Sequence, residues 1–298
     1  MNTFFVYEEA FSRNIGWVTR EEQKILRKKR VAIAGMGGVG GIHLLTLVRL
    51  GIENFNISDL DVFELANFNR QAGAMISTLG KSKVETLANM ALEINPELNI
   101  RTFPQGITQD NVHEFLDGVD LYIDGMDFFA FTIRQEIFST CYKHKIPAIT
   151  AAPLGMSAAV LNFLPGGMSF ENYFCWGNFS DEEKGVRFLL GLAPAGLHFR
   201  YLVDPTAVNL EEHRGPSTVM ACQICAGMAA TEALKILLNR GKVMAAPHGF
   251  QFDAYRNKFV HTWRPGGNNN IIQRLALVIA RKRLEKLKAT IIKRSCKD

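Results

Sequence analysis

The sequence is poor in cysteine, and neither its first residues nor its apolar runs have the pattern expected of a signal peptide or a membrane span. Its 298 residues include five cysteines, an odd number. A disulfide framework needs paired cysteines in an oxidising compartment, so we expect reduced thiols. The first residues, MNTFFVYEEAFSRN, carry acids and lack a basic flank, an uninterrupted apolar stretch and a small-residue cleavage site, which argues against a secretory signal peptide. We therefore expect a cytoplasmic protein.

No apolar run has the form of a membrane span. The most apolar segment, residues 31–52, is interrupted by glycines and by His43 and Arg49. This pattern fits a buried strand, turn and helix better than a transmembrane helix, so we expect no transmembrane segment. With 47% hydrophobic and 21% charged residues, the chain can bury a full core.

The positive charge is concentrated at the C-terminal end. Residues 271–298 contain nine Lys or Arg and two acidic residues, whereas the whole chain has a net charge of +5. A uniformly basic nucleic-acid-binding surface is therefore excluded, and any such role belongs to the tail. Leucines and isoleucines recur there at positions that predict a partly apolar helical face: Ile272, Leu275, Ile279, Leu287 and Ile291. An acidic partner, RNA or an anionic lipid surface would fit this tail, and a solvated or subunit-packing helix is the alternative.

Strand and helix patterns alternate along the first half of the chain. Residues 30–35 (RVAIAG) form an apolar run that stops at glycines, and residues 42–50 follow with apolar side chains at helical spacing. Further strands are expected at residues 54–61, 99–104, 119–127 and 147–152, with a helix over residues 83–94. This alternation predicts an α/β fold with a Rossmann-like, doubly wound and mostly parallel sheet.

The second half departs from this alternation. Residues 164–216 are rich in Gly, Pro and aromatics, and their only helix candidate is short (residues 186–193). A long apolar helix is expected over residues 217–240, followed by an antiparallel strand pair over residues 249–265 that turns at Arg256 and Asn257. We expect an N-terminal arm (residues 1–27), one domain (28–265) and a basic tail (266–298).

A glycine-rich turn follows the first expected strand. The segment GMGGVG contributes Gly35, Gly37, Gly38 and Gly40, which stand between a strand and a helix. In this context glycines let backbone amides approach phosphates at a helix N-terminus. Asp59 ends the next strand, where it can accept hydrogen bonds from ribose hydroxyls. These features alone fit NAD as well as ATP.

The residues that follow favour ATP. Arg70 lies in the segment NFNRQ directly after the ribose-binding position, where it can hold a triphosphate and where hydride transfer has no need of it. Lys83 follows in GKSKVE, and Asp127 ends a strand at the edge of the sheet where a carboxylate can hold Mg²⁺. Together these side chains make a phosphoryl clamp.

At this point the sequence resembles the E1-like adenylating family, which includes ubiquitin activators and bacterial sulfur-carrier activators. The resemblance covers roughly residues 10–265. Residues 11–26 look like the N-terminal signature of that family, 59–71 like its acid and NxxRQ segment, and 80–85 like its lysine segment. Residues 215–238 resemble the helix after the family's crossover loop, so residues 164–216 are expected to be that loop.

The resemblance implies a role for each matching residue. Asp59 is expected on the ribose, Asn67, Arg70 and Lys83 on the phosphates, and Asp127 on Mg²⁺. Arg13 is expected to reach the phosphates from a second subunit, which implies a homodimer. Alternatives for single residues remain open: Asp59 as a strand cap and Lys83 as a solvated helix residue.

At two points the sequence departs from the family pattern, which limits how far the residue roles of that family apply to this chain. Phe128 stands where many members place an asparagine after the metal-binding aspartate. Many members also hold structural zinc with two CxxC pairs, whereas this chain has only Cys222 and Cys225, inside an apolar helix. We expect core thiols at those two positions and no structural zinc.

Two features of residues 164–216 concern the binding of the substrate carboxylate and the transfer of its acyl group. Ubiquitin activators transfer the acyl group to a loop cysteine, and Cys175 is the one cysteine in this region; a packed thiol is the alternative. His213 and Arg214 are candidates for lining the acceptor site, with a role in capping the loop as the alternative.

The resulting expectation is an ATP-dependent adenylyltransferase that activates a carboxylate. The acceptor is a ubiquitin-like or sulfur-carrier protein, a peptide or a carboxylate on modified tRNA. An NAD-dependent oxidoreductase is the first rival, and a non-catalytic E1-like binding subunit is the second. The retention of Arg70, Lys83 and Asp127 argues against both.

Overall fold

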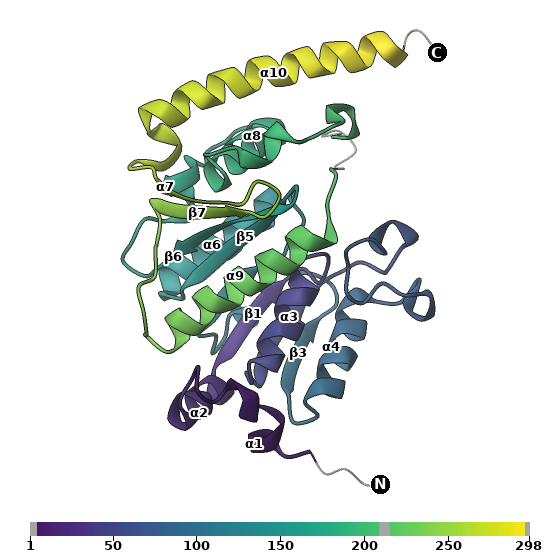
Figure 1. The fold of residues 1–298 in the computed structure, drawn as a ribbon, viewed down its shortest axis with the longest axis vertical. Helices are drawn as coiled ribbons and strands as arrows, with labels where there is room; N and C mark the ends of the chain where they lie inside the picture. Colours follow the sequence, from purple (N-terminus) through teal and green to yellow (C-terminus); the bar gives the residue numbers. More distant parts are fainter. Residues whose placement is uncertain (1–4, 209–214, 296–298) are drawn as a thin grey trace.

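One eight-stranded sheet organises the chain, and its strand order is β3-β2-β1-β4-β5-β6-β7-β8 (Figure 1). The computed structural model describes residues 5–208 and 215–295, with side chains up to residue 285. The strands are β1 (Arg30–Ala34), β2 (Asn54–Ser58), β3 (Asn99–Phe103), β4 (Leu121–Asp124), β5 (Ala148–Leu154), β6 (Ser157–Phe163), β7 (His248–Asp253) and β8 (Lys258–Trp263).

Helices connect and cover these strands. The α-helices are α1 (Tyr7–Ala10), α2 (Arg20–Lys28), α3 (Gly40–Arg49), α4 (Lys83–Ile94), α5 (Val112–Phe115), α6 (Phe131–His144), α7 (Phe170–Phe174), α8 (Asp181–Leu192), α9 (Val219–Leu237) and α10 (Ile271–Ser295). The 3₁₀ turns are η1 (Ser12–Asn14), η2 (Leu65–Asn67), η3 (Ile76–Thr78), η4 (Leu197–Arg200), η5 (Pro205–Ala207) and η6 (Gly267–Asn269).

The central strands of the sheet are buried on both faces. Val31 and Ile33 of β1 belong to a core cluster with α3, α4 and α9, whereas Ala32 and Ala34 belong to a second cluster with α5, α6 and α7. Successive side chains of a strand point to opposite faces, so both faces of β1 need apolar residues. This requirement explains why residues 31–34 of the strand form a continuous apolar run.

The expected sheet is confirmed, with one strand added. Strands β3, β2, β1, β4 and β5 pair in parallel, and β6 to β8 extend the sheet in antiparallel fashion. The strand pair turned at Arg256 and Asn257 is present, and Asn257 takes a positive φ of 52°. Strand β6 was missed, although every residue from Ser157 to Phe163 is buried.

Residues 164–208 contain more regular structure than the sequence predicts. Helix α8 starts at Asp181, five residues before the expected segment, and the Ser180 hydroxyl caps it by accepting from the Glu183 amide. Helix α7 was not expected at all. The start of α8 was not predicted because its first turn is charged, and α7 was not predicted because five residues are too few to show a helical period.

Helix α9 is long and apolar enough to cross a membrane by length and composition. It packs against β5, β6 and α3, and Cys222, Cys225, Ala226 and Ala229 on it are at most 1% exposed. We therefore assign α9 to the core of the sheet domain. Both cysteines of the CxxC pair are core thiols, as expected.

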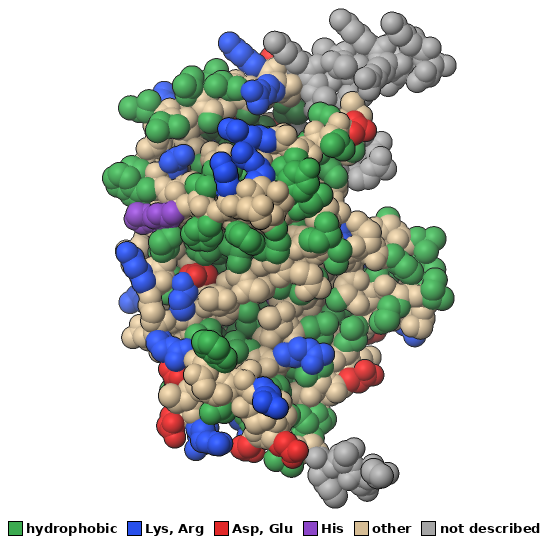
Figure 2. Space-filling model, viewed as in Figure 1, with side chains coloured by type: hydrophobic (Ala, Val, Ile, Leu, Met, Phe, Trp, Pro, Cys, Tyr) green, Lys and Arg blue, Asp and Glu red, His purple; other side chains and the backbone are tan. Residues whose placement is uncertain are grey.

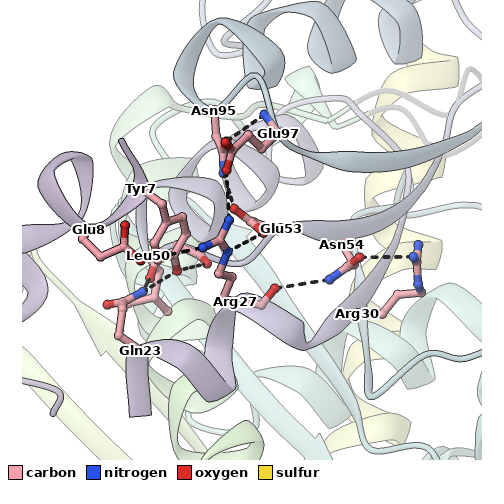
Figure 3. A network of polar contacts seen from close by, with 11 residues as sticks. Tyr7, Glu8, Gln23, Arg27, Arg30, Leu50, Glu53, Asn54, Asn95 and Glu97 are labelled. Carbon is pink, nitrogen blue, oxygen red and sulfur yellow. Dashed lines mark hydrogen bonds and ion pairs between the residues drawn. The ribbon is translucent and has the colours of Figure 1, made fainter. Parts of the chain in front are cut away.

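The N-terminal segment is tied to the rim of the sheet by a polar network (Figure 3). Arg27 of α2 bonds to Glu53 Oε2 at 2.8 Å and to Glu97 Oε2 at 2.9 Å. Gln23 of the same helix donates to the Leu50 carbonyl at the end of α3, at 2.9 Å. Residues 5–28 thus lie at the end of the molecule away from α10 (Figure 1).

Candidate functional site

The turn between β1 and α3 needs glycine at two positions. Gly35 adopts a φ of +89°, and a methyl group built on it would lie 2.3 Å from the carbonyl oxygen of Gly125. At Gly40, the first residue of α3, a methyl group would lie 1.7 Å from the carbonyl oxygen of Gly35. Any side chain at these positions would collide with the backbone. The turn is therefore built as a close-packed loop at a helix N-terminus, where backbone amides can approach an anion.

This turn lies where the strand order reverses. Strand β1 pairs with β2 on one side and with β4 on the other, and the chain leaves toward opposite edges of the sheet from these two strands. In open α/β sheets ligands bind outside the carboxyl ends of strands at such a switch point. The contact between Gly35 and Gly125 brings the β1–α3 and β4–α6 turns together there.

Asp59 is joined directly to the glycine turn. Its Oδ2 accepts a hydrogen bond from the Met36 amide at 2.6 Å, and its Oδ1 accepts one from the Asp61 amide at 2.8 Å. Burial raises the pKa of Asp59, and the two amides oppose that rise. The carboxylate is thus fixed at the end of β2 beside the turn.

Arg70 lies against the same turn. A methyl group built on Gly38 would be 3.4 Å from Cγ of Arg70 and 3.2 Å from Sγ of Cys222. The Arg70 guanidinium donates to Asn69 Oδ1 at 2.9 Å and to the Ala66 carbonyl at 3.0 Å. These contacts hold a positive charge next to the amides that would meet phosphates.

The two asparagines of the NxxRQ segment make structural contacts. Asn67 is 9% exposed, and its Oδ1 accepts from the Glu64 amide at 3.0 Å. Asn69 donates to the Ser217 carbonyl just before α9, at 3.0 Å. The segment is therefore fixed both within itself and to the start of α9, which sets the position of Arg70.

Lys83 has an acidic partner that the sequence did not reveal. Its ammonium group lies 2.9 Å from Asp61 Oδ2, and the residue is 6% exposed. Lys83 also begins α4, whereas Asp61 follows β2. The Asp61 amide bonds to Asp59, so Lys83, Asp61 and Asp59 form one connected group beside the glycine turn.

Asp127 was expected to end a strand, but β4 ends at Asp124 and Asp127 lies in the loop that follows it, before α6. The residue is exposed, and its Oδ1 accepts from the Phe129 amide at 2.9 Å. This leaves Oδ2 without a partner among the described residues. An exposed carboxylate with an open oxygen, at the edge where the glycine turn lies, fits the oxygen-ligand chemistry of Mg²⁺.

The loop that carries Asp127 is held by Arg134, whose role the sequence alone does not reveal. Arg134 donates to the carbonyls of Asp127 at 2.7 Å, Phe128 at 3.0 Å and Met126 at 3.2 Å. Its Nε lies 2.8 Å from Oδ2 of Asp124, and both side chains are at most 3% exposed. A forked guanidinium with this many partners fixes the path of the loop.

Arg13 is not brought to this group. It is exposed in η1, whose Asn14 donates to the Leu50 carbonyl at the C-terminal end of α3, at 3.2 Å. The glycine turn lies at the opposite end of that helix, about 15 Å away for ten residues. Arg13 therefore lies away from the glycine turn of its own chain.

Cys175 lies in a different part of the molecule, beside the start of α10. Its thiol approaches the carbonyls of Asn172 at 3.6 Å and Gly266 at 3.9 Å. Burial raises the pKa of this thiol, the opposite of what an activated nucleophile requires. His213 and Arg214 lie outside the described residues.

Clusters of three or more His, Cys, Asp or Glu side chains able to hold a metal ion are absent from the described part of the chain. The four cysteines placed there are free. Burial raises the pKa of Cys222, while Ser217 and the nearby Arg70 act against that rise. The thiol of Cys222 packs against Gly38 and so helps to position the glycine turn.

The geometry thus joins most of the expected site residues through direct contacts. The glycine turn, Asp59, Arg70 and the Asp127 loop all lie at the carboxyl ends of β1, β2 and β4. Asp61 and Arg134 were missed, and Cys222 was expected only as a core thiol. The available signal for Arg134 was weak: an arginine seven residues after Asp127, with nothing in the sequence to show that it is buried.

Residues 11–271 match the ThiF family, and the chain belongs to that family. A tRNA threonylcarbamoyladenosine dehydratase from Bacillus subtilis is 32% identical over 142 residues, covering 47% of this chain and 55% of the relative. A molybdopterin-synthase adenylyltransferase from Salmonella typhimurium is 28% identical over 143 residues, covering 48% and 57%. The chain thus spans little more than half the length of these curated relatives.

The fold is also that of known structures. The crystal structure of E. coli MccB with ATP superposes with a TM-score of 0.62 at 18% identity, covering 85% of this chain and 69% of that one. The superposition shows a shared fold, and an identity this low supports nothing beyond the fold. The E1-like, Rossmann-type architecture expected from the motifs is confirmed.

Proposed function

We propose that this ThiF-family chain is an ATP-dependent adenylyltransferase that activates a substrate carboxylate as its acyl-AMP. The proposal rests on family membership and on one structural observation. The glycine turn, Asp59 and Arg70 form a contiguous group at the topological switch point, joined by the Met36–Asp59 hydrogen bond of 2.6 Å. Amide donors, a ribose-binding acid and a fixed cation are the groups that bind a nucleoside triphosphate.

The phosphates would lie between the turn and the cations. The amides of Gly37, Gly38 and Val39 directly precede α3, and the Arg70 guanidinium is held beside them. Lys83 forms an ion pair with Asp61, so binding of a triphosphate would move the Lys83 ammonium group from the Asp61 carboxylate toward the phosphates. Asn67 supports the segment through its own backbone contacts and serves as a positioning residue.

Asp127 is the residue that would hold Mg²⁺. Its open oxygen and its place after β4 fit this cation, and the bound cation would supply positive charge beside the phosphate oxygens. Arg134 fixes the backbone of the same loop. The position of the carboxylate is therefore determined before the ligand arrives.

The reaction needs no protein nucleophile. An oxygen of the substrate carboxylate attacks the α-phosphorus, the bond from that phosphorus to the bridging oxygen breaks, and pyrophosphate leaves with the bonding electron pair. Arg70 and Lys83 stabilise the charge that develops on the leaving group. The acyl-AMP product retains the activated carbonyl for a second acceptor.

The active unit in this proposal is a homodimer. Arg13 lies at the far end of α3 from its own glycine turn, so a contribution to catalysis requires a second subunit. An arginine that arrives from a neighbour would offset pyrophosphate charge as an arginine finger does. We further propose a cytoplasmic setting, where ATP is available.

The carboxylate that is activated belongs to a larger molecule: the C-terminus of a ubiquitin-like or sulfur-carrier protein, a peptide, or a modified tRNA. Residues 164–208, which include α7 and α8, would cover this substrate as the crossover segment does in the family. Cys175 is the thiol of this segment that could receive an acyl group, although its raised pKa gives that role little support.

The test is ATP–pyrophosphate exchange by the full chain against a panel of these carboxylates. Exchange of labelled pyrophosphate into ATP that depends on one carboxylate class would support the proposal and identify the acceptor. A panel member whose C-terminal carboxylate is amidated serves as the matched control. Reduction of NAD⁺ or oxidation of NADH by the protein, without any pyrophosphate exchange, would show that the oxidoreductase alternative is correct.

A further inference from the structure

One face of α10 is packed against the domain. Gln273 Nε2 donates to the Leu190 carbonyl of α8 at 2.6 Å, and Leu277 is 3% exposed. One turn further, Arg281 Nε lies 2.8 Å from Glu183 Oε2. These three residues recur every four positions, so they define a single inward face.

The opposite face of the same helix is apolar and uncovered. Five large aliphatic side chains there are between 44% and 83% exposed: Ile271, Ile272, Leu275, Val278 and Ile279. Successive residues are 100° apart around a helix, which places all five on the side away from Gln273 and Leu277. Because its inner face is already bonded to α8, the helix cannot turn to bury them.

A cluster of this kind differs from scattered surface leucines. Single exposed apolar residues are normal, but a contiguous patch on one face marks an interaction site. Hydrophobic and basic side chains lie side by side at the end of the molecule formed by α10 (Figure 2). We call the five aliphatic residues the outer patch of α10.

Basic side chains border the outer patch. Arg274, Lys282 and Arg283 are exposed and lie three or four residues from patch members, which makes them neighbours on the helix surface. Glu285 is the single acidic residue among residues 271–285. Two copies that met through this patch would bring cations against cations, which disfavours self-association.

The shape of the patch also restricts its partner. It is carried by one helix at one end of the molecule, beyond α8, and is therefore a convex ridge rather than a groove (Figure 1). RNA would account for the cations but not for five aliphatic side chains. A partner protein would need a matching groove, whereas a fluid bilayer adapts to a convex helix.

We infer that the outer patch of α10 docks the protein on an anionic lipid bilayer, with the helix lying in the plane of the interface. The aliphatic side chains would enter the boundary of the acyl chains, and the three cations would meet anionic headgroups. The inference is independent of the adenylation chemistry. It makes the association peripheral, because α9, the one described helix with the length and composition of a span, lies in the core.

The test is co-sedimentation of the full chain with vesicles of phosphatidylglycerol and phosphatidylcholine, compared with phosphatidylcholine alone. We expect binding to the anionic vesicles only. The double variant Leu275→Asp with Ile279→Asp should lose it, and Lys282→Gln with Arg283→Gln should weaken it about thirtyfold. Ile76→Asp, at a 79% exposed isoleucine of η3, should bind as the wild type does.

Four results would overturn the inference. The first is no sedimentation with anionic vesicles, and the second is binding that the Leu275→Asp and Ile279→Asp substitutions leave unchanged. The third is a wild-type dimer in sedimentation velocity that those substitutions dissociate, which would assign the patch to self-association. The fourth is a protein that binds RNA and does not bind vesicles, where Lys282→Gln with Arg283→Gln abolishes RNA binding and Leu275→Asp with Ile279→Asp leaves it unchanged. Thermal unfolding confirms that each variant is folded.

Discussion

Arg134 and Asp124 form a buried ion pair, with 2.8 Å between Nε and Oδ2. Thr150 also donates to that oxygen, at 2.9 Å, so the carboxylate of Asp124 has partners on β5 and α6. The rest of the guanidinium binds loop carbonyls and stacks over Phe188, 4.6 Å from the ring centroid. The pair thus connects the end of β4 to β5 and, through Phe188, to α8.

Replacement of Arg134 by Met should destabilise the fold strongly. It would leave Asp124 charged, buried and without its cation, a defect that costs about 3–5 kcal/mol. Denaturant unfolding followed by circular dichroism measures the change. Arg101→Met, which removes an exposed arginine from a 3.5 Å surface pair with Asp117, is the control and should cost less than about 1 kcal/mol. Equal effects of the two substitutions would contradict the assigned role.

His43 should make the protein sensitive to mild acid. Burial lowers the pKa of His43 to about 4, and neither ring nitrogen has a partner among the described residues. The unfolded chain binds a proton near pH 6.5 and the folded chain does not, so stability is lost as pH falls from about 6.5 toward 4. Between pH 7 and pH 5 the loss is about 2 kcal/mol.

Between pH 7 and pH 5, a His43→Leu variant should lose about 2 kcal/mol less stability than the wild type loses. His198, whose pKa is also lowered to about 4 by burial, acts in the same direction in both proteins and does not affect the comparison. The measurement is the denaturation midpoint at each pH. If both proteins lost equal stability, protonation of His43 would not be linked to unfolding.

Asp127→Asn should abolish catalysis while leaving the fold intact. The amide oxygen of Asn can still accept from the Phe129 amide, but the charge that Mg²⁺ requires is removed. We expect pyrophosphate exchange to fall by about a hundredfold or more. Asp110→Asn, at an exposed aspartate before α5, should retain full activity. Full exchange by the Asp127 variant would show that this carboxylate does not serve the reaction.

Arg13→Ala and Asp127→Ala should complement each other after subunit exchange. Each variant alone is inactive in the proposed homodimer, but a mixed dimer has one site with both residues present. Random exchange makes about half of the dimers mixed, so activity should return to about a quarter of the wild-type value. An inactive mixture with exchange confirmed, or a fully active Arg13→Ala variant, would remove Arg13 from the site.

The sequence predicted the central strands β1, β2 and β4 because they are buried on both faces. Val31 to Ala34 is apolar without interruption, and glycines end the strand at a definite point. Strand β6 was not predicted because SAAVLNF follows another apolar run directly, separated by a two-residue turn at Gly155 and Met156. The boundary between two adjacent buried strands leaves little trace in hydrophobicity.

The site was predictable where its chemistry uses backbone constraints or charged motifs. Gly35 and Gly40 occupy positions where only glycine fits, so the motif reflects geometry directly. Arg134 was not predictable in this way, since its burial depends on the packing of α6 against α8 and the β4 loop. The Lys83–Asp61 pair likewise depends on how α4 returns to the end of β2.

The most direct test of the account is calorimetric titration of the full chain with Mg-ATP and, separately, with NAD. We expect Mg-ATP to bind and NAD to show no measurable heat of binding. Arg70→Ala should weaken ATP binding about tenfold to a hundredfold, because a charge-assisted phosphate contact is lost, whereas Arg101→Met should leave it unchanged. Binding of NAD without binding of ATP, or ATP affinity unaffected by Arg70→Ala, would contradict the account.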